Sequence, residues 1–254
     1  MRRISLAVVL TTALLLAFSG PAAAIQFGRP DGNNHPQAGI MVAFVDGAPA
    51  WRCTGTMIDP LVFLTAGHCV YGADRVEIWF DSNRPTSYPW VGDYSGTPIA
   101  HPEYDDFARY PATYDIGVVL LDEPHPGPYA TLAPIGTLDQ MAHSARKGVQ
   151  FDLVGYGVQD TRRPFFRATV TRYFGQASIV NTRSANTAGY SVQISSAPGK
   201  GGSLCFGDSG GPVFLTGTTQ SSQSTRSSST CAAWAPASRT GPTRPTRWPS
   251  STNT

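Results

Sequence analysis

Gly207-Asp208-Ser209-Gly210-Gly211-Pro212 is the most informative segment of this chain. A serine between glycine-rich flanks keeps an uncrowded hydroxyl, and the glycines leave nearby backbone N–H groups able to point at a substrate. Acyl transfer needs both features. Two further stretches lie upstream, Leu64-Thr65-Ala66-Gly67-His68-Cys69 and Tyr114-Asp115-Ile116-Gly117-Val118-Val119-Leu120-Leu121. Together the three stretches supply a nucleophile, a general base and a carboxylate that can orient the base.

The order His68, Asp115, Ser209 separates two kinds of hydrolase. Proteins with the α/β-hydrolase topology also carry Gly-x-Ser-x-Gly, but their acid and histidine follow the serine. No His, Asp or Glu occurs after Ser209, so that topology is excluded. The three stretches and their spacings resemble the trypsin/chymotrypsin family of secreted serine proteases over about residues 25 to 215. The resemblance implies an all-β fold of two six-stranded antiparallel β-barrels, with the active site in the cleft between them.

The resemblance also implies a role for each residue of the site. Ser209 is the expected nucleophile, His68 the base that removes its proton, and Asp115 the carboxylate that fixes the imidazole tautomer. The backbone N–H groups of Gly207 and Ser209 are expected to form the oxyanion hole. By the same resemblance, Ser203, six residues before the nucleophile, is expected at the base of the specificity pocket. Because it is not a carboxylate, we expect no strict preference for Arg or Lys at the cleavage site.

Other acids and histidines compete for these roles. Asp105 and Asp106 lie in a polar loop, whereas Asp115 alone directly precedes an apolar strand. The remaining histidines lack such a context and are expected to be surface or packing residues: His35, His101, His125 and His143. Metal catalysis has no support, because the chain has neither His-Glu-x-x-His nor a Cys/His ligand spacing. No cofactor is expected.

Composition restricts the partners. The chain has 254 residues, of which 41% are apolar and 14% charged, enough for one large β domain or two small ones sharing a cleft. Its formal net charge of +2 is spread without basic runs, so neither nucleic acid nor an anionic membrane is expected as a partner. We expect a monomer that acts on protein or peptide substrates.

The amino terminus indicates export. Met1-Arg2-Arg3 precedes an apolar stretch from about Ile4 to Phe18, and the segment ends in Ala22-Ala23-Ala24. This pattern is typical of a secretory signal peptide over residues 1–24, and the apolar stretch is short for a bilayer span. An uncleaved membrane anchor is the alternative. We expect the mature protein to be extracellular and free of the membrane.

Export makes the four cysteines disulfide candidates, and four cysteines allow three pairings. The family resemblance implies the pairs Cys53 with Cys69, which closes the histidine loop, and Cys205 with Cys231. Free thiols are the alternative, but they fit an oxidising compartment poorly.

Asp208 needs a partner of its own, because an unpaired buried carboxylate is costly. In the family this residue pairs with an α-amino group released by cleavage before an Ile or Val. Ile25 directly follows the Ala22-Ala23-Ala24 site, so one cut by signal peptidase would free its amine. The alternative is that Ile25 is merely the first mature residue.

Short apolar runs between turn residues fill the chain from residue 37 to 215 and predict strands. We expect the break between the two barrels near residues 124–138, which leaves His68 and Asp115 on the first barrel and Ser209 on the second. The predicted strand runs are Ala38 to Val45, Leu61 to Leu64, Val76 to Phe80, Gly117 to Leu121, Val149 to Val154, Ala168 to Tyr173, Tyr190 to Ile194 and Pro212 to Leu215.

Residues 216–254 differ abruptly from the protease-like region, 25–215. They contain no Val, Ile, Leu, Met, Phe, Lys or acid, so they cannot supply a core strand, and the second barrel is expected to be incomplete. One interpretation is a genuine Ser/Thr/Pro-rich tail. The other is a reading-frame slip that leaves a disordered end. One choice of synonymous codons for Gln220 to Ser227, regrouped to begin at the last base of each codon, encodes an apolar strand pattern. The gene sequence around codons 215 to 220 distinguishes them.

Two functional classes remain open. The first is a secreted serine endopeptidase. The second is a non-catalytic protein with a protease fold that binds rather than cuts, or a product inactivated by its abnormal tail.

Overall fold

The first half of the chain closes into a barrel of six antiparallel strands in the order β2-β3-β4-β7-β6-β5. These are β2 (Ala38–Val45), β3 (Ala48–Asp59), β4 (Val62–Thr65), β5 (Arg75–Trp79), β6 (Tyr94–Ala100) and β7 (Gly117–Leu121). The computed structural model describes residues 25, 28–84, 91–138, 150–159, 169–181, 184–195, 202–217 and 220–221. Met41, Met57, Phe63, Ile78 and Val119 fill the barrel and are wholly buried.

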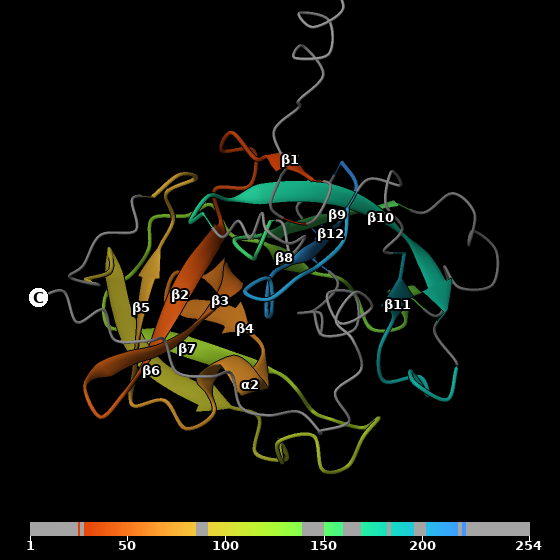
Figure 1. Ribbon diagram of the computed structural model, residues 1–254, viewed down its shortest axis with the longest axis horizontal. Coiled ribbons are helices and arrows are strands. Elements are labelled where there is room, and N and C mark those ends of the chain that lie inside the picture. Colours follow the sequence, from red (N-terminus) through yellow and green to blue (C-terminus); the bar gives the residue numbers. More distant parts are fainter. Residues whose placement is uncertain are drawn as a thin grey trace, which may run out of the picture.

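The second half forms a seven-stranded sheet in the order β1-β10-β9-β12-β13-β8, with β11 paired to β10. Figure 1 shows β10 as a long curved strand that runs across this sheet beside the barrel. The strands are β1 (Arg29–Pro30), β8 (Thr131–Leu132), β9 (Gln150–Gly155), β10 (Tyr173–Asn181), β11 (Gln193–Ile194), β12 (Val213–Leu215) and β13 (Gln220–Ser221). Along β10 buried residues alternate with less buried ones, so one face packs on a core that includes Phe151, Leu153 and Val213.

The all-β architecture is therefore confirmed, with differences in its second half. Within the described residues this sheet does not close into a barrel, and β13 pairs with β8 in parallel rather than antiparallel. The strand predicted at Ala168 to Tyr173 is wrong in its bounds, because β10 begins at Tyr173. Arg172 just before it turns inward to a buried ion pair, which removes that stretch from the sheet.

Two strands of the barrel, β3 and β6, were not anticipated. Both contain residues typical of turns, such as Pro49 in β3 and Pro98 in β6, and these obscure the alternating pattern. The tail is described only at Thr216, Gly217, Gln220 and Ser221, of which the last two form β13. The rest of the tail and the predicted signal peptide, residues 1–24, lie outside the described residues. No helix in the described part of the chain is long and apolar enough to cross a membrane.

A buried charge network joins the two halves. Arg172 and Asp31 are both fully buried, and the Arg172 Nε donates to Asp31 Oδ2 over 2.9 Å. Burial by itself raises the pKa of Asp31, but hydrogen bonds from His35 and the charge of Arg172 outweigh this effect, so the pKa lies below its usual range. The other acceptors of the Arg172 guanidinium come from both halves of the chain: Asn33 Oδ1, Ala38 O, Phe80 O and Tyr156 Oη.

Candidate active site

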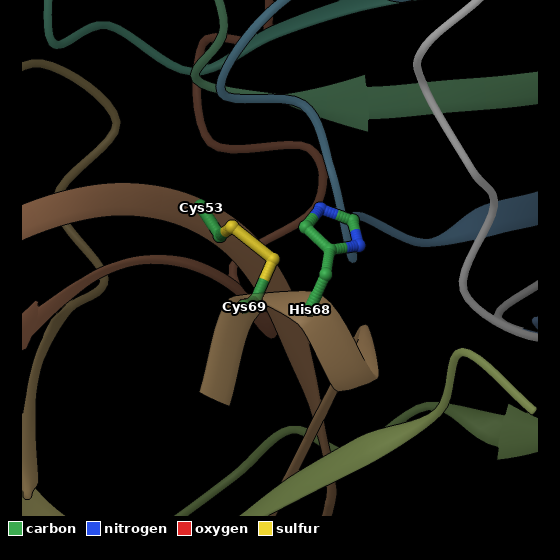
Figure 2. A group of neighbouring side chains, drawn as sticks. All are labelled: Cys53, His68 and Cys69. Atoms are coloured by element: carbon green, nitrogen blue, oxygen red, sulfur yellow. A yellow bond between two sulfur atoms is a disulfide. The ribbon is translucent and has the colours of Figure 1, made fainter. Parts of the chain in front are cut away.

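His68 sits on the short helix α2 (Gly67–Val70), directly after β4. The neighbouring Cys69 is joined by a disulfide to Cys53 in β3, which ties the helix to the barrel wall (Figure 2). The indole of Trp51 adds a second tie, since its Nε1 donates to the carbonyl of Cys69 over 2.8 Å. Both ties hold Cys69, the residue directly after His68.

Asp115 lies two residues before β7, and its carboxylate faces His68. Its Oδ2 lies 2.9 Å from His68 Nδ1, and its Oδ1 accepts the backbone N–H of His68 over 2.8 Å. The Asp115 side chain is only 7% exposed and that of His68 is 22% exposed. With Nδ1–H donated to the carboxylate, Nε2 on the open side of the ring carries the lone pair that a general base needs.

The loop that carries Ser209 reaches this pair from the second sheet. Gly210 has φ +77°, and a Cβ there would lie 2.7 Å from Ala66 N, so only glycine allows this close approach next to α2. The carbonyl of Ser209 accepts the backbone N–H of Thr54 in β3 over 2.9 Å. The structure therefore brings the segments of all three predicted triad residues to one place.

Gly207, the other expected oxyanion donor, has φ +96° and is half-buried. Its carbonyl accepts the hydroxyl of Thr54 over 2.8 Å. Among the described residues its own N–H has no acceptor, so this group can bind a substrate oxygen.

Asp208 is fully buried between these two residues. Its carboxylate accepts the backbone N–H groups of Gly157 and Cys205 over 2.7 and 2.8 Å. Burial raises the pKa of Asp208 to about 7, although these hydrogen bonds and the charge of Arg52 act in the opposite direction. Arg52 lies close by, with its Nε 3.5 Å from the position of a Cβ on Gly207, and burial lowers its pKa.

Ile25, the predicted partner of Asp208, is fully buried in the core of the second sheet. Its Cγ2 lies 3.0 Å from the position of a Cβ on Gly202, in the segment that leads to the Ser209 loop. In this chain Ile25 is still bonded to Ala24 and has no free amine. The ion pair between Ile25 and Asp208 therefore stays a prediction.

The remaining predicted site residues lie in the same segment. Ser203 is 2% exposed and Cys205 is fully buried and disulfide-bonded. Cys231, the expected partner of Cys205, lies outside the described residues. Cys53, His68 and Cys69 form a group close enough to hold a metal ion, but the disulfide between the two cysteines leaves no thiolate ligand.

The competing residues have other contacts. Asp105 pairs with Arg109 over 2.6 Å, and Asp106 accepts the hydroxyl of Tyr104. Three of the other histidines have structural surroundings: His35 binds Asp31, His101 stacks on Tyr114, and His125 packs against Phe80. His143 lies outside the described residues.

Sequence reasoning missed Arg52 and Thr54. Arg52 directly precedes Cys53 in β3 and Thr54 directly follows it. The loop that they contact is distant in sequence: Thr54 and Gly207 are separated by 153 residues. No local pattern signals such a contact. Adjacency to Cys53 was the single available hint.

Comparisons with known proteins agree with this geometry. The chain is 27% identical over 186 residues to a collagenase of Hypoderma lineatum, which covers 70% of this chain and 66% of the relative. It is 25% identical over 181 residues to a chymotrypsin of Phaedon cochleariae, which covers 66% of this chain and 61% of the relative. The chain thus spans a little under two thirds of the length of the curated relatives it matches.

The fold has a solved counterpart. The structure of HL collagenase superposes with a TM-score of 0.52 at 20% identity, over 79% of this chain and 81% of that one. The sequence model of the trypsin family matches residues 28–234, most of the chain. With its barrel, its second sheet and the meeting of His68, Asp115 and the Ser209 loop, the chain belongs to the trypsin family.

Proposed function

We propose that this chain is a secreted serine endopeptidase that hydrolyses peptide bonds through Ser209, His68 and Asp115. The observation that carries the proposal is the 2.9 Å contact of His68 Nδ1 with Asp115 Oδ2, beside a loop that presents Ser209. Family membership supports the same activity. Peptide or protein substrates follow from that membership, whereas export rests on the sequence of residues 1–24.

The reaction proceeds in two acyl transfers. Ser209 Oγ bonds to the carbonyl carbon of the substrate while its proton passes to His68 Nε2, and the carbonyl π electrons move onto oxygen. The N–H groups of Gly207 and Ser209 bind that oxyanion. The C–N bond then breaks, the amine leaves with the proton of His68, and water hydrolyses the acyl-enzyme by the same steps in reverse.

Specificity for an uncharged residue before the cleaved bond is part of the proposal. Ser203 is buried and uncharged, so a substrate cation reaching it would lose its hydration without gaining a counter-ion. One relative bears the name collagenase. Native and heat-denatured collagen therefore belong in a substrate panel beside peptides with Ala, Leu, Phe or Arg before the cleaved bond.

The organisation of the chain completes the proposal. Residues 1–24 are a signal peptide, residues 25–215 the protease domain with its internal break near 124–138, and residues 216–254 a tail of abnormal composition. The mature protein acts as an extracellular monomer. Support comes from the sequence patterns of these segments.

Labelling with a fluorophosphonate tests the activity directly, because the reagent phosphonylates a serine, with loss of fluoride, only when a base activates that serine. We expect the secreted chain to be labelled and to cleave peptides, and Ser209→Ala to lose both properties. Ser95→Ala is the matched control, since it removes a surface hydroxyl bonded to Asp122 in the barrel. A wild-type chain that folds but is neither labelled nor active would favour the non-catalytic binding protein. Labelling that survives Ser209→Ala would refute the assigned nucleophile.

A further inference from the structure

Thr54 is a fully buried residue of β3 whose polar groups all have partners. Its hydroxyl donates to the carbonyl of Gly207 over 2.8 Å and accepts the backbone N–H of Tyr156 over 3.1 Å. Its backbone N–H donates to the carbonyl of Ser209 over 2.9 Å, and its carbonyl accepts the hydroxyl of Thr65. One residue of the barrel thus contacts both residues expected to donate to the oxyanion.

The hydroxyl contact matters because a glycine such as Gly207 restricts its own backbone dihedral angles less than any other residue. A glycine adopts φ +96° without strain but also adopts many other conformations, so its own residue type does not fix the direction of its N–H. The bond from Thr54 holds the peptide between Gly207 and Asp208, and the bond from Val158 N–H to the Phe206 carbonyl, over 2.8 Å, holds the peptide that carries the Gly207 N–H. The Asp208 carboxylate, bound to Gly157 N and Cys205 N, holds the side chain of the next residue.

We propose that Thr54 is a positioning residue of the oxyanion hole. Its hydroxyl holds the Gly207 backbone in the conformation that aims the Gly207 N–H at the substrate oxygen. Thr54 touches no reacting atom and acts through Gly207. The inference rests on the proposed function. Donors that are already oriented stabilise the charge that develops in the transition state without reorganising, so the contribution is expected in kcat rather than KM.

The test compares Thr54→Val with Thr54→Ser and Thr56→Val. Thr54→Val keeps the shape and the backbone N–H but removes the hydroxyl, whereas Thr54→Ser retains the hydroxyl. Thr56→Val is the matched control, because Thr56 is a buried neighbour on the same strand whose hydroxyl donates to Gln37 O. Removing a whole oxyanion donor lowers the rate about 10²–10³-fold, so loss of its positioner should lower kcat by roughly ten- to a hundred-fold.

The expected pattern separates positioning from stability. We expect Thr54→Val to lose kcat with KM changed less than about two-fold, and Thr54→Ser and Thr56→Val to stay near wild type. A peptidyl trifluoromethyl ketone, whose hemiketal oxygen is an anion in the hole, should bind Thr54→Val at least about ten-fold more weakly. The same peptide ending in a methyl amide should bind all variants equally.

The outcomes distinguish this inference from the proposed function. A folded wild-type chain without activity overturns the function and this inference together. An active wild type with Thr54→Val as active as Thr56→Val, or with equal losses of ketone and amide binding, overturns the inference alone. If Thr54→Val is unfolded at the assay temperature by circular dichroism, Thr54→Ala is measured in its place against Thr54→Ser under the same criteria.

Discussion

At the scale of single residues, the buried carboxyl of Asp208 makes the stability of the folded chain depend on pH. Burial raises its pKa to about 7 in a chain still joined to Ala24. The folded chain therefore binds this proton more tightly than the unfolded chain, whose carboxyl titrates near 4. The free energy of unfolding consequently falls as the pH rises from about 4 to about 7, by up to about 1.4 kcal/mol per pH unit.

A free amine on Ile25 would remove this dependence, because an opposite charge lowers the pKa of a carboxyl. We expect a steeper loss of stability between pH 4 and 7 in a chain that retains Ala22-Ala23-Ala24 than in one that begins at Ile25. Asp208→Asn should give the same pH dependence in both chains. Urea unfolding of the four proteins, each carrying Ser209→Ala to prevent self-cleavage, measures the difference. If the free energy of unfolding depended on pH in the same way in the two chains that keep Asp208, the predicted ion pair between Ile25 and Asp208 would be contradicted.

The grouping of the proposed site residues was predictable where the proposed chemistry imposes a local pattern. His68, Asp115 and Ser209 each lie in a stretch whose neighbours suit the proposed reaction, so the sequence indicates them as candidates, and the structure brings their segments together. Thr54 and Arg52 lie in the first half of the chain and contact the loop of Ser209 in the second half. Apart from their adjacency to Cys53, nothing beside them in the sequence indicates those contacts.

At the scale of elements, β3 organises the site. Three consecutive residues of this strand, Arg52, Cys53 and Thr54, face the Ser209 loop or hold the helix of His68. The disulfide of Cys53 with Cys69 closes a short loop, since the two cysteines are 16 residues apart. A link of this span restricts the unfolded chain.

Replacing both cysteines, as Cys53→Ala with Cys69→Ala, should lower the free energy of unfolding by about 3 kcal/mol. Urea unfolding of the double variant and of wild type measures the loss. In a reducing buffer the two curves should converge, because wild type then lacks the same link. Equal stability without reductant would show that this disulfide contributes nothing.

The strands themselves were predicted unevenly. β2 and β7 match the expected runs at Ala38 to Val45 and Gly117 to Leu121, since both are unbroken apolar segments. The expected bounds of β10 were wrong because its partly buried positions include Gln176 and Ser178, polar residues that obscure the run of apolar ones. Pairing with β9 and β1, rather than composition, places that strand in the sheet.

At the scale of the whole molecule, the ion pair of Asp31 with Arg172 links the segment before the barrel to the second sheet. Both side chains are fully buried, so removing one leaves the other charged and without water. The pKa of Asp31 is lowered, hence the stability that it contributes is present above about pH 4 and is lost as the pH falls through the folded value. No periodicity in the sequence could have indicated this pairing.

Arg172→Met should lower the free energy of unfolding by about 3–5 kcal/mol at pH 7. Arg109→Met is the matched control: its partner Asp105 lies at the surface and the Arg109 side chain is 54% exposed, so a loss of at most about 1 kcal/mol is expected. The double variant Arg172→Met with Asp31→Asn should recover part of the loss. Denaturant unfolding of the four proteins decides; similar losses for the two single variants would contradict a structural role of the network.

The bonds that Thr54 makes across the two halves also limit how the molecule can move. A hinge that swung the barrel away from the second sheet would break the contacts of Thr54 with Gly207, Ser209 and Tyr156 together. Opening of that kind would separate the segments of the proposed site instead of admitting a substrate. Substrate entry must therefore leave the barrel and the second sheet in contact at Thr54.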